Sequence, residues 1–307
     1  MSGTVEQFSR LLLDDDAFQQ SLDPERLAAV FVRHFNLPER PGLDEVKALM
    51  ERAGFGTVEE WEMDGLKGAH IGRPRGRYRI YCRGDLWEGT KAHTLLHEAY
   101  EIVMETMCDL HTDSPPQRSV CREADRFAAA TLMQQAEFSR LAQDCGLDVA
   151  ALQREFGCSY ASVTLRLAEA LPRLPLMAVL YERSDGRDPG FWTEPADLRA
   201  KIVRRTQGFG TPGDYPICGA RGGIPRRGRP IPEGSLAARA ARSGVPQLGK
   251  GGGVSAIAQP VTWNGKLAKV VVVAVREQDF GILVPQMEAL CLGRRRSRPV
   301  AATAGPR

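Results

Sequence analysis

Apolar side chains recur every three or four residues through the first half of the chain, which is the spacing of amphipathic helices. One such stripe follows Asp23-Pro24-Glu25, where an Asp at the N-cap and a Pro at the first helical position mark a helix start. Turn-forming residues interrupt the pattern, most clearly at Pro115 and Pro116. Helices are therefore predicted over residues 23–35, 42–52, 88–107 and 119–138 and, in shorter pieces, over 139–171.

Strand signals occur in two other parts of the chain. Arg77 to Cys82 alternates basic with apolar side chains, which predicts a small sheet over residues 57–87. In the last third, apolar runs are separated by stretches rich in glycine and proline, and a helix is indicated only near 235–242. The runs are Leu176–Tyr181, Val254–Val261 and Lys269–Val275, and they favour an α+β or sheet-centred C-terminal domain.

The composition is that of an ordinary globular protein. The 307 residues suggest two or three domains, and 43% of them are hydrophobic. No apolar run reaches the roughly 18 residues that a membrane helix needs, and acids at Asp14 to Asp16 interrupt any signal-peptide core. The seven cysteines form no CxxC pair, which argues against a disulfide framework and a zinc ribbon. We expect a reduced, cytoplasmic protein with no membrane partner.

Charge is divided unevenly along the chain. Residues 1–171 carry 19 basic and 28 acidic side chains, a balance of −9, whereas residues 172–307 carry 22 and 10, a balance of +12. The basic half could attract nucleic acid, dock against the acidic half or form a solvated surface. Its best candidates for nucleic-acid contact are the arginines at 226–229 and 294–296.

The helix predicted over 88–107 contains a group of residues that could bind a metal ion. His93, His97 and Glu101 follow one another at intervals of four, so neighbouring pairs share one helix face. All three would span about 12 Å, too far for one ion. Only the pair His97 and Glu101 places a glutamate, Glu98, directly after the first ligand, as in HExxH helices where that glutamate is the general base. The motif here is HExxE, and a carboxylate is an acceptable zinc ligand.

Two helical segments carry a resemblance to a known family. HTLLHEAYE (93–101) and CREADRFAAATLMQ (121–134) resemble the two core helices of the ImmA/IrrE metallopeptidases. The segment 141–171 resembles the helix-turn-helix that follows that core. GRPIPEGSLAARAARSGVP (228–246) and PVTWNGKLAKVVVVAV (260–275) are similar to the GAF-like domain of the three-domain IrrE/PprI branch.

The resemblance implies an α+β chain of three folded parts. A small gluzincin-like peptidase core of helices and sheet would span 1–138, a helix-turn-helix segment 139–171, and a GAF-like α/β sensor domain 172–290. A basic tail over 291–307 is expected to be disordered. In the second helix of the helix-turn-helix, over 159–170, Arg166 is the only basic residue. We therefore interpret that segment as structural rather than as a DNA reader.

The departures from the family pattern fall on the metal ligands. The family's second histidine is Glu101 here, its third ligand, a glutamate, is Cys121, and the family's Asn is Asp125. On a helical wheel of about 100° per residue, Cys121 and Asp125 lie within about 40° of each other, whereas Glu123 lies near 200°, toward solvent. The Zn²⁺ ligands implied are therefore His97, Glu101 and Cys121, with Asp125 as the alternative third ligand.

The resemblance implies a zinc-dependent endopeptidase in which Glu98 moves protons. Its substrate would be a transcriptional repressor of the helix-turn-helix type, cleaved in a stress or mobile-element response. The alternative is a non-catalytic regulator with a degenerate peptidase site. That regulator would act through a small-molecule signal at the sensor domain, or by binding DNA or protein.

Overall fold

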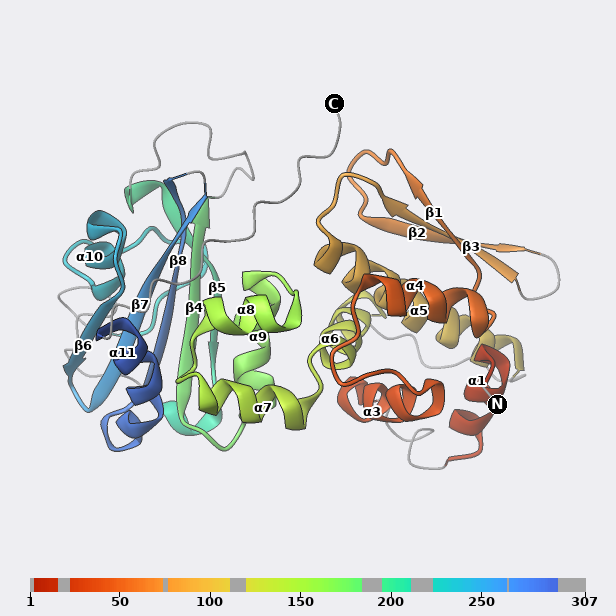
Figure 1. Cartoon of the computed structure of the whole chain (residues 1–307), viewed down its shortest axis with the longest axis horizontal. Coiled ribbons are helices and arrows are strands. Elements are labelled where there is room, and N and C mark those ends of the chain that lie inside the picture. The colour runs from red at the N-terminus through yellow and green to blue at the C-terminus, as the bar shows by residue number, and fades with distance from the viewer. Residues whose placement is uncertain are drawn as a thin grey trace. The chain divides into compact units, whose positions relative to one another are not determined.

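The computed structural model describes residues 3–15, 23–73, 77–110, 120–183, 195–210, 223–263 and 265–291, which divide into two units (Figure 1). Unit 1 comprises Met1–Ser139 with Gln153–Arg166, and unit 2 comprises Arg140–Leu152 with Leu167–Arg307. Each unit contains helices and one sheet, so the α+β class is confirmed. The predicted basic tail lies beyond the described residues, except for Cys291 at its start.

An aromatic core holds the helices of unit 1 together. Phe8, Phe31 and Phe127 are buried, with the ring of Phe31 in edge contact with the other two. Helix α3 begins as predicted, with Asp23 at the N-cap and Pro24 at the first position. The helices of this core are α1 (Val5–Leu13), α3 (Pro24–Phe35), α4 (Leu43–Arg52), α5 (Glu88–Leu110) and α6 (Val120–Leu132).

The small sheet predicted over 57–87 is present and lies against α4 and α5. Its strands are β1 (Thr57–Trp61), β2 (Gly68–Arg73) and β3 (Arg77–Arg83), in the order β1-β3-β2. Alternation along β3 turns Tyr78, Ile80 and Cys82 into the core. Strand β2 pairs antiparallel with β3 and forms one edge of the sheet. Because His70 lies opposite Ile80 in that register, it belongs to the face that covers α5.

The prediction of a single helix over 119–138 is wrong at the C-terminal end of that range. Helix α6 ends at Leu132, and α7 (Gln135–Asp144) begins after a break at Met133 and Gln134. The side chain of Gln134 donates to the carbonyl of Pro38, and the guanidinium of Arg166 donates to the carbonyl of Met133. The bond from Arg166 satisfies the carbonyl of Met133 at the break, and neither Gly nor Pro marks the break in the sequence.

Three short helices occupy the segment predicted as helix-turn-helix. They are α7, α8 (Val149–Phe156) and α9 (Tyr160–Ala170), and the division between the units passes through all three. In unit 1, the side chain of Arg166 is 0% exposed and donates to both carboxylate oxygens of Glu25. This arginine is therefore not available to phosphate. The helix-turn-helix assignment itself stays a prediction.

Unit 2 is built on a five-stranded antiparallel sheet of order β5-β4-β8-β7-β6. The runs predicted from sequence are its central strands, β4 (Leu176–Arg183), β7 (Val254–Trp263) and β8 (Lys266–Arg276). The two outer strands, β5 (Leu198–Arg205) and β6 (Gln247–Gly251), were not expected.

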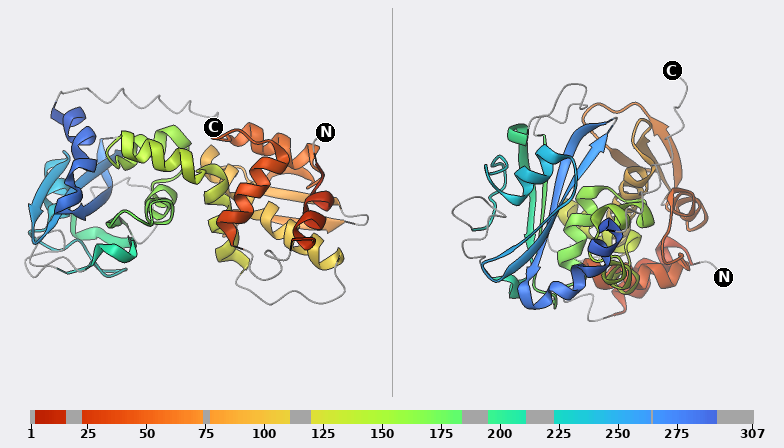
Figure 2. Two further views of the ribbon diagram at one scale, coloured as in Figure 1. Left: turned by 90° about the horizontal axis from the view of Figure 1, so that it is seen from below. Right: turned by 60° about the vertical axis from the view of Figure 1, so that its left-hand side comes forward.

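Helix α10 (Leu236–Ser243) packs on one face of this sheet, as Figure 2 shows, and begins at the N-cap Ser235. The remaining elements of unit 2 include α11 (Val284–Cys291) and the 3₁₀ turns Pro195–Asp197, Gln207–Phe209 and Glu277–Leu283. The GAF-like assignment stays a prediction. No helix in the described parts of the chain is both long and apolar enough to cross a membrane.

Candidate metal centre

Three potential ligand atoms from α5 and α6 lie close together in unit 1. The Nε2 atom of His97 is 3.3 Å from Oε1 of Glu101, one helical turn later on α5. The Sγ atom of Cys121, near the start of α6, is 4.0 Å from the same Oε1. The three ligand atoms all lie within 4.8 Å of one another. The structure therefore brings together the residues that the sequence predicts as ligands.

Asp125 contacts the opposite side of the His97 ring. Its Oδ1 is 3.0 Å from Nδ1 of His97, while Nε2 points toward Glu101. Hydrogen bonds to Asp125 and Glu101, opposed by burial, raise the pKa of His97 to about 10. In this arrangement Asp125 faces Nδ1, the ring nitrogen that is not directed at Glu101, and so orients the imidazole. A carboxylate at the outer nitrogen of a histidine ligand is a common feature of metal sites.

Glu123 lies away from this group. The hydroxyl of Tyr100 donates a hydrogen bond to Oε2 of Glu123 at 3.1 Å. The helical wheel placed Glu123 toward solvent, but the side chain is half-buried in this contact. Tyr100 is itself buried and packs on Phe127.

Glu98 is buried between α5 and the edge strand β2. Its side chain is 7% exposed, and its Oε2 lies 2.7 Å from Nδ1 of His70. A Cβ atom on Gly68 would lie 2.3 Å from the methyl group of Thr94 and 3.2 Å from Oε1 of Glu98, so the strand approaches the helix closely here. The carboxylate is therefore held from one side by His70 and confined by the backbone of β2.

His70 is the functional candidate that sequence reasoning missed. Its Nε2 is 3.0 Å from Oε1 of Glu105, and its Nδ1 is 3.9 Å from Oε2 of Glu101. Burial disfavours the charged ring, but hydrogen bonds to Glu98 and Glu105 outweigh it and raise the pKa of His70 to about 9. The sequence pattern around His70 indicates this role only weakly, because the residue turns inward only through the pairing of β2 with β3.

The remaining histidine of the α5 motif, His93, does not lie among the potential ligands. It is grouped neither with His97, Glu101 and Cys121 nor with His70 and Glu98. Burial lowers its pKa to about 4, against a smaller opposing effect of Asp125. The ring is therefore neutral near pH 7.

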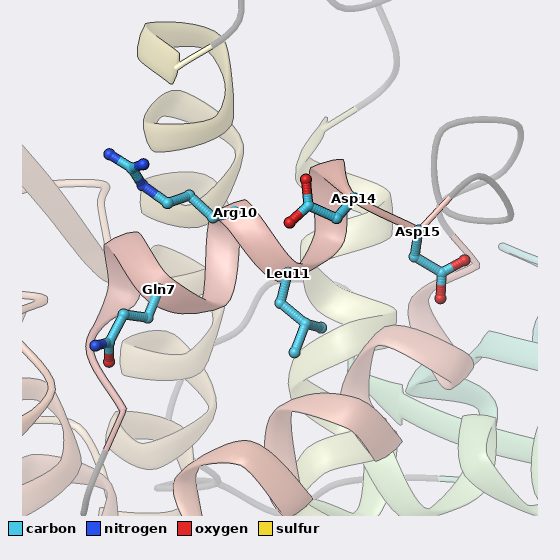
Figure 3. A pocket seen from close by; sticks show the side chains of 5 residues that line it. All are labelled: Gln7, Arg10, Leu11, Asp14 and Asp15. Carbon is cyan, nitrogen blue, oxygen red and sulfur yellow. The ribbon is translucent and has the colours of Figure 1, made fainter.

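The donor set fits zinc. Imidazole nitrogen, carboxylate oxygen and thiolate sulfur are all zinc ligands, and three protein ligands leave a fourth position for water. Two of the three donors are anionic, so zinc bound here would be a weaker Lewis acid than zinc bound by two histidines and one glutamate. The separate surface depression on α1, lined by Gln7, Arg10, Leu11, Asp14 and Asp15, contains none of these residues (Figure 3).

Part of the chain matches the model of a known protein family. Residues 58–168 match the family model of the IrrE N-terminal-like domain, Peptidase_M78. The matched residues comprise the small sheet, α5, α6 and the short helices after them. The chain therefore contains an IrrE N-terminal-like domain of the metallopeptidase type, and the resemblance that the motifs at 93–101 and 121–134 carry is confirmed.

One solved structure extends the comparison to most of the chain. A transcriptional regulator of Mycobacterium tuberculosis has a TM-score of 0.55 to this protein, covering 87% of this chain and 92% of the other at 15% sequence identity. At that identity the likeness concerns the fold alone. No curated protein matches the chain.

Proposed function

We propose that the protein is a cytoplasmic, zinc-dependent endopeptidase that cleaves a transcriptional repressor of the helix-turn-helix type. The observation that carries the proposal is the group formed by His97, Glu101 and Cys121, whose ligand atoms lie within 4.8 Å of one another. Glu98 follows the first of these residues directly, as the general base does in HExxH peptidases. The family match over 58–168 supports the peptidase class.

The residues of this site have separate tasks. His97, Glu101 and Cys121 would hold zinc, which supplies a Lewis acid for the scissile carbonyl and makes a bound water more acidic. Glu98 accepts the proton of the attacking water and returns it to the leaving amine. Asp125 keeps Nε2 of His97 directed at the ligand position.

The edge of the small sheet offers a place for the substrate. Strand β2 pairs with β3 on one side only, and it lies beside α5. An extended peptide could add to this edge through main-chain hydrogen bonds. That binding mode would bring a backbone segment of the repressor alongside Glu98.

The test is Glu98→Gln, which preserves shape and removes the proton acceptor. The fold and the zinc bound at one equivalent of added metal should be unchanged, and cleavage should fall by at least the roughly 10²–10⁴-fold that general acid–base catalysis contributes. Mass spectrometry of newly formed N-termini, in cells expressing the native or Glu98→Gln protein, would identify the cleaved repressor. A Glu98→Gln protein that still restores the response of a deletion strain would contradict the enzymatic proposal.

Two observations favour a second candidate function, a non-catalytic regulator with a degenerate peptidase site. The ligand set has two anionic donors, which weakens zinc as a catalyst. In unit 2, Arg226, Arg227 and Arg229 are exposed next to β5, where they could contact nucleic acid. A regulator of this kind would respond through unit 2, to a small molecule or to DNA, and Glu98→Gln would leave it functional.

A further inference from the structure

A second group of potential metal ligands lies beside the first. Nδ1 of His70, a carboxylate oxygen of Glu98 and one of Glu101 all lie within 4.8 Å of one another. The side chains of His70 and Glu98 are only 9% and 7% exposed. Nitrogen and carboxylate donors in this number suit zinc and similar divalent ions.

The orientation of His70 matches that of a metal ligand. One ring nitrogen, Nδ1, faces Glu98 and Glu101, and the other, Nε2, lies 3.0 Å from the carboxylate of Glu105. Histidines that bind metals almost always donate their second N–H to such an outer acceptor. His97 has the same arrangement, with Asp125 at its outer nitrogen. The two imidazoles are therefore held in the same way by carboxylates outside the ligand positions.

Glu101 lies between the two groups. Its Oε1 faces His97 and Cys121, and its Oε2 faces His70. A carboxylate with one oxygen toward each position can bridge two divalent ions, which in two-metal sites lie about 3.5–4 Å apart. Glu98, Glu101, Glu105 and Asp125 also give this region more carboxylates than imidazoles, and a second cation would balance that excess.

We infer that a second divalent cation binds between His70, Glu98 and Glu101 and inhibits the peptidase proposed above. Binding displaces the proton on Nδ1 of His70 to solvent and makes Glu98 a ligand. The lone pair with which Glu98 would accept a proton from water is then donated to the ion. One bound zinc would thus support cleavage, whereas a second, taken up at higher zinc concentration, would stop it.

Zinc binding to the purified, full-length protein tests this inference. Equilibrium dialysis should give two Zn²⁺ per native chain, the second bound more weakly. His70→Ala and His70→Gln should each lose one ion, and His70→Gln keeps a hydrogen-bond donor toward Glu98, so it controls for loss of fold. Glu105→Gln should weaken the second ion about 10–100-fold, as expected for an outer partner of a ligand. Glu123→Gln is the matched control and should change neither ion.

Cobalt distinguishes the two positions by spectrum. Only the position that includes Cys121 offers a thiolate, so only that ion gives a sulfur-to-metal charge-transfer band. The band should saturate at one equivalent of Co²⁺ while binding continues to two, and Cys121→Ser should remove the band and retain the ion at His70.

The inference rests on the proposed metal-dependent function only for its inhibitory effect. A native protein that saturates at one zinc, or a second zinc that survives in both His70 variants, would overturn it. If the single ion is then lost in Cys121→Ser, the proposed catalytic centre still stands. If instead Cys121→Ser leaves the single ion bound and His70→Gln abolishes its binding, the proposed catalytic centre is contradicted as well.

Discussion

The hydroxyl of Tyr100 donates a hydrogen bond to Oε2 of Glu123 at 3.1 Å. This contact engages Glu123, the acidic residue in the first turn of α6. Cys121, two residues earlier, is left as the α6 side chain whose ligand atom lies beside His97 and Glu101. The identity of the third ligand therefore depends on which way the first turn of α6 faces.

Substituting Cys121 and Glu123 one at a time should show which of them binds the ion. Cys121→Ser replaces a thiolate with a weak ligand and should lower zinc occupancy strongly at one equivalent of added metal. Glu123→Ala removes only the partner of Tyr100 and should leave occupancy unchanged. Metal analysis of both purified variants provides the measurement, and the reverse result would show that Glu123 faces the ion.

Thiol alkylation should report on the same residue. Cys121 is exposed, whereas burial raises the pKa of Cys82 to about 11 and that of Cys158 to about 12. Among Cys82, Cys108, Cys121, Cys145 and Cys158, Cys121 should react first with iodoacetamide when a chelator is present, because only thiolates react readily. Added zinc should slow that reaction, as peptide mass spectrometry can measure. Equal rates with and without zinc would indicate that the sulfur is not a ligand.

The metal-free protein should lose stability as pH rises. The pKa of His97 is raised to about 10 by Asp125 and Glu101, against an ordinary value of 6.5. The folded protein binds the proton of His97 more tightly than the unfolded chain does. The contribution of protonated His97 to the free energy of unfolding is therefore complete below about pH 6.5 and is lost as pH approaches 10. Urea unfolding with chelator at pH 6, 8 and 10 would measure this. His97→Asn should flatten the trend, and an unchanged slope in that variant would assign it to other groups.

Arg166 should matter to stability rather than to DNA binding. Its side chain is 0% exposed, and its two terminal nitrogens lie 2.5 and 2.6 Å from the oxygens of Glu25. Arg166→Ala leaves that carboxylate unpaired, and since Glu25 is partly exposed we expect a loss of about 3 kcal/mol, the lower end for a broken buried pair. Arg10→Ala, which removes an exposed pair with Glu6, should cost about 0.3–0.5 kcal/mol. Similar losses in the two variants would contradict this assignment.

The sequence contained enough information for the α5 and α6 part of the centre. Helical spacing alone places Glu101 one turn after His97, a local relationship that depends on the geometry of one helix. Cys121 lies on a second helix, and the sequence indicated it through the resemblance to the family, while the wheel of α6 separated it from Glu123.

The features that sequence reasoning missed depend on contacts between distant segments. His70 faces Glu98 only because β2 pairs in a particular register with β3 and then packs on α5. The break after Leu132 is stabilised by the Arg166 and Gln134 side chains, without a helix-breaking residue. Strand β5 carries mostly polar and charged side chains on one face and is an edge strand, so its apolar signal was weak.

X-ray absorption at the zinc edge identifies the atoms bound to the ion and so tests the three proposed ligands together. With one equivalent of zinc, we expect one sulfur neighbour at about 2.3 Å and nitrogen or oxygen neighbours at about 2.0–2.2 Å. Cys121→Ser should lose the sulfur neighbour. A spectrum of native protein with nitrogen and oxygen neighbours alone would contradict a centre formed by His97, Glu101 and Cys121.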